Sequence, residues 1–226
     1  MSRPQLALGT AQFGLNYGIT NAAGQVDATT AAQLLQRAQA SGVCWLDTAQ
    51  AYGTAEQVLG AALPQGHHFR LISKLPAQPP GPFDQQQVDL WQAGLEQSLQ
   101  HLGVPQLDAL LLHASADLAR PDGSCLLAWL QQVQQQGLVQ RIGVSIYSAS
   151  ELDGLPLEAL QLVQLPCSLY DQRLIANGTV RRLRDHGIAI HARSLYLQGL
   201  LVTPAQEWPT NIASDLRLHH QRLQAW

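Results

Sequence analysis

Four side chains that can carry a proton or a charge follow short apolar stretches of the sequence. Asp47 ends "WLD", Tyr52 comes five residues later, Lys74 lies in "ISKL", and His113 follows "LLL". A free tyrosine has a pKa near 10 and is a poor acid at neutral pH, but a nearby ammonium lowers that pKa. We therefore expect a proton-transfer site in which Asp47 pairs with Lys74 and Lys74 lowers the pKa of Tyr52. The imidazole of His113 then orients a carbonyl oxygen.

Each of these residues, taken alone, also has an ordinary structural explanation. An aspartate at a strand end is often a helix cap, a lone lysine has no special meaning, and a histidine after three leucines is usually a hydrogen-bonded core residue. Their succession is harder to explain in this way, because they follow consecutive predicted strands. Residues at the carboxyl ends of barrel strands face the active site.

Apolar runs alternate with stretches of helical periodicity along the whole chain, which favours an α/β protein with a parallel sheet. No GxGxxG follows the first strand, so a Rossmann fold is disfavoured. We expect a (β/α)8 barrel of the TIM-barrel type that lacks its eighth strand-helix unit. Strands are predicted at 5–14, 43–49, 69–75, 107–114, 141–148, 160–169 and 188–201. Helices are predicted at 27–42, 54–63, 86–103, 124–139, 148–155, 177–187 and 214–226.

Helix signals support several of these ranges. Thr54 and Gln57 have the spacing of a capping box, and Gly103 is placed to end the long helix before it. No stretch resembles a linker between domains. We therefore expect a single domain over residues 1–226, incomplete at its C-terminus.

Composition narrows the choice of partners and compartment. The net charge is −3 and no Lys/Arg cluster occurs, so nucleic acid is not an expected partner. No run of about 18 apolar residues is present, and no membrane association is expected. Three cysteines without CxxC spacing, Cys44, Cys125 and Cys167, are expected to be reduced, buried thiols in a cytoplasmic protein.

Several segments together resemble the aldo-keto reductase superfamily, whose members are (β/α)8 enzymes that use NADPH or NADH. The resemblance covers nearly the whole chain and rests on "LGTAQFG", "LDTAQAYGTAEQVLG" with its glutamate Glu56, "ISKL", "LLLH", "GVS" and "VQLPCSLYD". It implies that the catalytic residues are Asp47, Tyr52, Lys74 and His113. Tyr52 is then the general acid in the reduction of an aldehyde or ketone to an alcohol.

The same resemblance implies a cofactor site. Ser145 and Gln164 match residues that bind the nicotinamide carboxamide, and Arg193 stands where the family often has an aromatic residue stacked on the nicotinamide. The segment 194–201 resembles the loop that contacts the pyrophosphate. The residues predicted to bind NADPH or NADH are Gly9, Thr10, Ser145, Gln164, Arg193, Ser194, Leu195, Gln198 and Gly199.

Two other functions remain open. A barrel without its eighth strand has open edges at its first and seventh strands, which invite self-association. The chain is then a truncated, catalytically weak binding or assembly protein. A metal-dependent barrel enzyme is the third alternative, but the pairs His67-His68 and His219-His220 lack the spacing of a metal site, and no metal ligands are predicted.

Overall fold

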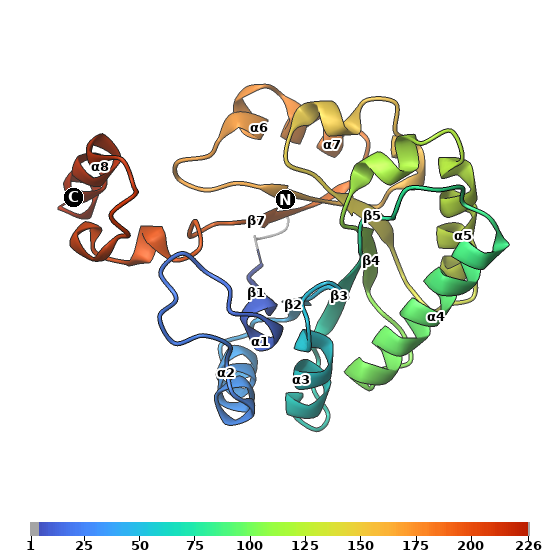
Figure 1. Cartoon of the computed structure of the whole chain (residues 1–226), viewed down its shortest axis with the longest axis horizontal. Helices are drawn as coiled ribbons and strands as arrows, with labels where there is room; N and C mark the ends of the chain where they lie inside the picture. The colour runs from blue at the N-terminus through green and yellow to red at the C-terminus, as the bar shows by residue number, and fades with distance from the viewer. Residues whose placement is uncertain (1–4, 226) are drawn as a thin grey trace.

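Seven short parallel strands form one curled sheet in the order β1-β2-β3-β4-β5-β6-β7. Figure 1 shows the computed structural model, which describes residues 5–225. The strands are β1 (Ala7–Gly9), β2 (Trp45–Asp47), β3 (Arg70–Leu75), β4 (Ala109–Leu112), β5 (Ile142–Ser145), β6 (Leu162–Pro166) and β7 (Ala189–Arg193). This arrangement confirms the prediction of a (β/α)8 barrel of the TIM-barrel type that lacks one strand-helix unit.

Apart from the last helix, the longer helices lie on the outer side of the curl (Figure 1). The longest, α4 (Gln85–Leu102), presents Trp91 and Leu95 to the sheet. Gly103 ends α4 with a left-handed φ of 67°, as the sequence predicts. The α-helices are α1 (Ala11–Gly14), α2 (Ala28–Ala40), α3 (Ala55–Ala62), α4 (Gln85–Leu102), α5 (Gly123–Gln135), α6 (Arg173–Ala176), α7 (Thr179–Asp185) and α8 (Ser214–Gln224).

Two apolar clusters cover the two faces of the sheet. Leu46, Leu110 and Val163 point outward into the large cluster beneath the helices. Their neighbours point inward into a small cluster that fills the base of the barrel, made of Trp45, Ile72, Ala109, Leu111 and Leu162. Since successive side chains of a strand point to opposite faces, this alternation fixes which later residues face the barrel interior.

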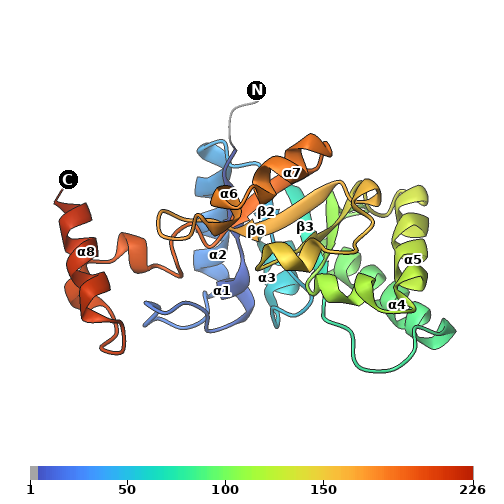
Figure 2. The ribbon, with the colours of Figure 1, turned by 90° about the horizontal axis from the view of Figure 1, so that it is seen from above.

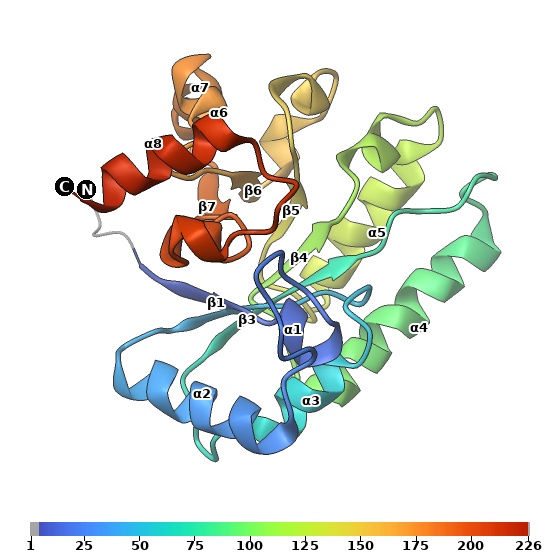
Figure 3. The same ribbon diagram turned by 60° about the vertical axis from the view of Figure 1, so that its left-hand side comes forward.

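The barrel is open between its first and last strands. Both β1 and β7 have a neighbour on one side only, so the circle does not close within residues 5–225. Figure 3 shows the two strands at the ends of the curl. Ala7, Gly9 and Ala189 are exposed along this opening. The open edges predicted from the sequence are therefore present in the fold.

The C-terminal segment stands apart from the barrel. Helix α8 lies on the opposite side of the molecule from α4 and α5 in both Figure 1 and Figure 2. Within this segment the ring of His220 stacks on Trp208, at 4.6 Å between centroids. The hydroxyl of Tyr170, in the loop after β6, lies 3.3 Å from Nδ1 of His220. Aromatic contacts therefore attach the segment to the loop after β6.

Three expectations about local structure are wrong. The residues after the first strand form the short helix α1 rather than extending the strand. Thr54 does not form a capping box, because its hydroxyl instead accepts a hydrogen bond from Gln25 and its side chain makes no capping bond. Finally, Cys44, Cys125 and Cys167 are free thiols, but they are half-buried rather than buried.

No helix in residues 5–225 is long and apolar enough to cross a membrane. The same residues contain no cluster of three or more histidine, cysteine, aspartate or glutamate side chains arranged to hold a metal ion.

Two helical glycines make a matched test of this packing. A Cβ at Gly60 in α3 would collide with the backbone carbonyl of His101 at the end of α4. A Cβ at Gly94 in α4 would meet only the flexible side chain of Gln50, at 3.4 Å. We expect Gly60→Ala to lower the free energy of unfolding in urea by about 1–3 kcal/mol. Gly94→Ala should be neutral or raise it by up to about 1 kcal/mol, through helix propensity. Equal stability of the two variants would contradict the close α3–α4 contact.

Candidate active site

The inward-facing residue at the carboxyl end of each strand contributes to one rim of the barrel. Each of three rim residues comes two positions after a side chain that points into the barrel. Asp47 comes after Trp45, Lys74 after Ile72, and His113 after Leu111. The strand register continues this ring, since Ser145 pairs with Gln164 and Pro166 pairs with Arg193. The structure therefore brings residues from β2 to β7 to the same end of the barrel.

A buried ion pair lies at the centre of the rim. The ammonium of Lys74 donates to both carboxylate oxygens of Asp47, at 2.8 and 2.9 Å, and to the backbone carbonyl of Thr48, at 2.8 Å. The Lys74 side chain is only 1% exposed and that of Asp47 is 16% exposed. A lysine ammonium has three N–H donors, so all of them are satisfied in this arrangement.

Tyr52 lies above this pair. Nζ of Lys74 is 5.2 Å from the centroid of the Tyr52 ring, over its face. The imidazole of His113 meets the same ring edge to face, at 5.7 Å between centroids. The hydroxyl of Tyr52 forms no hydrogen bond with any other group in residues 5–225. The structure thus brings together the four residues predicted from the sequence and leaves the phenol without a partner.

The expected lowering of the tyrosine pKa is wrong for this structure. Burial, together with the negative charge of Asp47, raises the pKa of Tyr52 above its ordinary value. Lys74 cannot offset this effect by a hydrogen bond, because Asp47 and Thr48 occupy its donors. The cation that favours the phenolate is Arg193.

Burial also favours the neutral forms of the two bases. It lowers the pKa of Lys74, while the adjacent Asp47 carboxylate acts in the opposite direction. The pKa of His113 is lowered by burial and by the charge of Lys74. At neutral pH the imidazole is therefore neutral and has one N–H to donate.

Gln164 and Ser145 are buried side by side on neighbouring strands, each 3% exposed. The amide nitrogen of Gln164 donates to Oδ1 of Asp47, at 2.9 Å. The sequence prediction did not include this contact. It gives Oδ1 of Asp47 a second donor beside Lys74 and leaves the Gln164 carbonyl oxygen free to accept a hydrogen bond.

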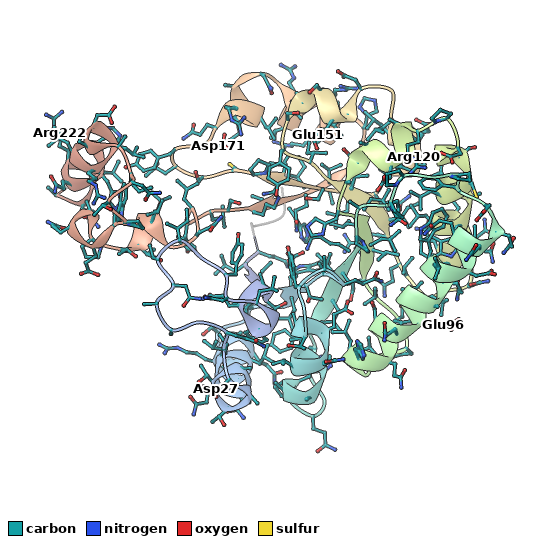
Figure 4. The ribbon with its side chains drawn as sticks, in the orientation of Figure 1. Asp27, Glu96, Arg120, Glu151, Asp171 and Arg222 are labelled. Atoms are coloured by element: carbon teal, nitrogen blue, oxygen red, sulfur yellow. The ribbon has the colours of Figure 1, made fainter. Side chains whose placement is uncertain are left out.

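Arg193 lies at the end of β7, and its side chain is half-buried. Its guanidinium stacks on the ring of Tyr147, 3.9 Å from the centroid, and donates to the carbonyl of Ile146 at 3.0 Å. Glu151, labelled in Figure 4, fixes this loop by accepting from the backbone N–H groups of Tyr147 and Ser148. One face of the guanidinium is thus covered before any ligand binds.

The end of the first strand leaves free space at the rim, beside Gly9. Gly9 is exposed, and a Cβ added there would meet no heavy atom within 4 Å. Thr10 is buried instead, and its hydroxyl donates to the backbone carbonyl of Asp47 at 3.0 Å. Gly9 can therefore contact a ligand directly, whereas Thr10 supports the strand that carries Asp47.

The segment after β7 has an unusual backbone. Ser194, Leu197 and Gln198 have positive φ angles of 59°, 47° and 56°, and Gly199 follows with 99°. Such conformations cost free energy in residues other than glycine and collect at functional sites. The hydroxyl of Thr20 reaches across from the loop after β1 and donates to the Gln198 carbonyl at 3.2 Å. Leu195 points outward and is 42% exposed.

Sequence reasoning missed three side chains near this rim. Tyr17 is close enough to Tyr147 and Arg193 for their charges to affect its pKa, which burial raises. His191 faces the barrel interior below Arg193 and meets Trp45 edge to face at 5.1 Å. The alternation of "IHAR" in β7 could have revealed His191, but no local signal marks Tyr17 or Tyr147.

Comparisons with known proteins agree with this geometry. The sequence model of the Aldo/keto reductase family matches residues 5–217. An uncharacterized oxidoreductase of Schizosaccharomyces pombe is 32% identical over 136 residues, which are 57% of this chain and 44% of that protein. The chain thus spans less than half the length of this curated relative.

Solved structures share the fold. A Pseudomonas aeruginosa protein assigned to the aldo-keto reductases superposes with a TM-score of 0.69 at 23% identity, over 86% of this chain and 74% of that one. A Klebsiella pneumoniae aldo/keto reductase, solved in complex with NADP and acetate, gives a TM-score of 0.65 at 19% identity, over 87% and 65%. From the family match over nearly its whole length, this chain belongs to the aldo/keto reductase family.

Proposed function

We propose that this protein is an NAD(P)H-dependent oxidoreductase that reduces an aldehyde or ketone to an alcohol. The observation that carries the proposal is the Tyr52 hydroxyl, which has no hydrogen-bond partner in residues 5–225 and stands between His113 and a buried Lys74–Asp47 pair. An unpartnered phenol in this setting is available to a carbonyl oxygen.

Tyr52 is the general acid in this proposal. Its raised pKa keeps the phenol protonated at neutral pH, which is the form that reduction requires. As the carbonyl carbon gains a hydride, the carbonyl oxygen takes the proton of the Tyr52 hydroxyl. The resulting phenolate then regains a proton from water. The neutral imidazole of His113 donates its N–H to the same carbonyl oxygen and orients it.

The positive charge of Arg193 favours the phenolate that forms in this step. Lys74 does not donate a hydrogen bond to the phenolate, because its donors bind Asp47 and Thr48. The Lys74 ammonium lies over the face of the Tyr52 ring and fixes the position of the ring. Asp47 orients Lys74 in turn, and Gln164 holds Asp47. The residues that position the acid thus form a chain of contacts from β6 to β2 and β3.

The residues present fit a nicotinamide cofactor. In this proposal the carbonyl oxygen of Gln164 and the hydroxyl of Ser145, on neighbouring strands, bind the carboxamide, and the uncovered face of Arg193 stacks on the ring. The space beside Gly9 is open, since a Cβ added there would meet no heavy atom within 4 Å. The segment 194–199 is proposed to contact the pyrophosphate through the N–H groups that its turns leave unbonded, since those of Leu197 and Gly199 donate to the carbonyls of Ser194 and Tyr196. NADPH or NADH supplies the hydride when bound.

Relatives support the choice of cofactor. The Klebsiella pneumoniae aldo/keto reductase was solved with NADP, and we carry this cofactor over to the present chain as part of the proposal. The substrate is proposed to be a small carbonyl compound. A single domain over residues 1–226 and a cytoplasmic location remain predictions.

A second candidate function rests on the open edges of β1 and β7. Unpaired strand edges present N–H and C=O groups to another chain. The protein would then be a catalytically weak family member that acts by self-association. A stable dimer on size-exclusion chromatography would support this function, and a well-behaved monomer would count against it.

The role of Tyr52 can be tested by Tyr52→Phe, which removes only the hydroxyl. We expect the rate of NADPH-dependent aldehyde reduction, followed at 340 nm, to fall by about 10²- to 10⁴-fold. The KM for NADPH should change little, because no cofactor contact is assigned to the phenol. Tyr170→Phe is the matched control, since it removes a hydroxyl in the loop after β6 and should keep the rate. A Tyr52→Phe rate within threefold of the unmodified protein would exclude Tyr52 as the acid.

The buried pair gives a prediction about stability and pH. In Asp47→Asn the Lys74 amine stays buried without its carboxylate, so its folded-state pKa falls further below the unfolded value of about 10.4. Between these two pKa values the unfolded chain binds more protons, and the free energy of unfolding must rise with pH. Urea unfolding of Asp47→Asn should show a loss of about 3–5 kcal/mol at pH 7 that shrinks toward pH 10.

The double variant Asp47→Asn/Lys74→Met is the control, because it lacks the titrating amine. Its free energy of unfolding should not show this recovery. Parallel pH curves for the single and double variants would mean that Lys74 is not the group that titrates.

A further inference from the structure

Arg193 is a cation without a carboxylate partner at the rim of the barrel. Among residues 5–225, no aspartate or glutamate oxygen forms an ion pair with its guanidinium. Its hydrogen bonds go to the Ile146 carbonyl and, at 3.4 Å, to the Ser194 hydroxyl. A guanidinium has five N–H donors, so three of them remain without a partner in this part of the chain.

Two carboxylates around the rim already bind other cations. Asp47 is bound to the Lys74 ammonium and also accepts from the amide of Gln164. Asp171, labelled in Figure 4, accepts from Nε and Nη2 of Arg173 at 2.8 and 2.9 Å. A third carboxylate, that of Glu151, accepts from the backbone N–H groups of Tyr147 and Ser148. Arg193 is therefore a cation of the rim that forms no ion pair within residues 5–225.

This charge is fixed in position at the end of β7, on the inner face of the sheet. Tyr147 covers one face of the guanidinium, and Glu151 holds the loop that carries Tyr147. The guanidinium lies on the inner side of β7, and its field acts on Tyr52 and His113. A planar guanidinium with free N–H groups matches the geometry of a carboxylate.

We infer that Arg193 selects carbonyl substrates that also carry a carboxylate, which its free N–H groups bind while the carbonyl oxygen lies against Tyr52. This inference rests on the proposed function.

The test compares aldehyde acids with their own methyl esters. The probes are 4-oxobutanoate and 4-carboxybenzaldehyde, each against its ester, with NADPH in excess. We expect the unmodified protein to favour the acid over the ester by about 10- to 100-fold in kcat/KM for at least one pair, the range of a charge-assisted hydrogen bond. Arg193→Gln should reduce this ratio to near one, mainly through the KM for the acid. Arg193→Lys should keep part of it.

Arg181→Gln is the matched control, because it removes an exposed arginine of α7 that lies 3.9 Å from Asp185 and leaves the Asp171–Arg173 pair intact, and it should keep the ratio. Circular dichroism melting shows whether each variant is folded. If Arg193→Gln does not fold, Arg193→Lys tests the role of the guanidinium instead. Turnover of acid and ester with a ratio near one in the unmodified protein, or a ratio unchanged in Arg193→Gln, would overturn this inference alone. No turnover of either probe would overturn the proposed function and this inference with it.

Discussion

The architecture of the site depends on one constraint, the burial of the Lys74 ammonium. A charge in the protein interior is tolerated only when it is paired and hydrogen-bonded. Here Asp47 and the Thr48 carbonyl occupy all three of its N–H groups. This requirement fixes the end of β2 against β3, which in turn sets the position of Tyr52 in the loop that follows. Because no donor remains, the lysine positions the tyrosine by lying over its ring and does not bind its oxygen.

The seven strands provide everything that this constraint needs. The ion pair lies between β2 and β3, and its support from Gln164 comes from β6, so the open boundary between β1 and β7 does not interrupt the set. Behind β3, the hydroxyl of Ser73 donates to the buried carboxylate of Glu56 at 2.5 Å, which ties α3 to the same strand. Of the residues expected to meet the cofactor, Gly9 and Arg193 lie on the two strands that border the opening.

The sequence predicted the parts of the structure that depend on alternation and order. Asp47, Lys74 and His113 were expected at one rim because they come at the carboxyl ends of consecutive predicted strands, and the structure has them there. It could not predict interactions that depend on distance between side chains. The raised pKa of Tyr52, the amide of Gln164 on Asp47 and the stacking of Arg193 on Tyr147 all join residues remote in the chain. The capping box failed because Thr54 found a partner in Gln25, more than twenty residues away.

The central claim is that this seven-stranded barrel binds a nicotinamide cofactor beside Tyr52. Titration of the unmodified protein with NADPH, followed by the fluorescence of the reduced nicotinamide, tests it most directly. We predict saturable binding with a Kd between about 1 μM and 1 mM, the range in which enzymes usually hold their substrates. Absence of any binding signal at millimolar NADPH, from protein shown to be folded, would contradict the account.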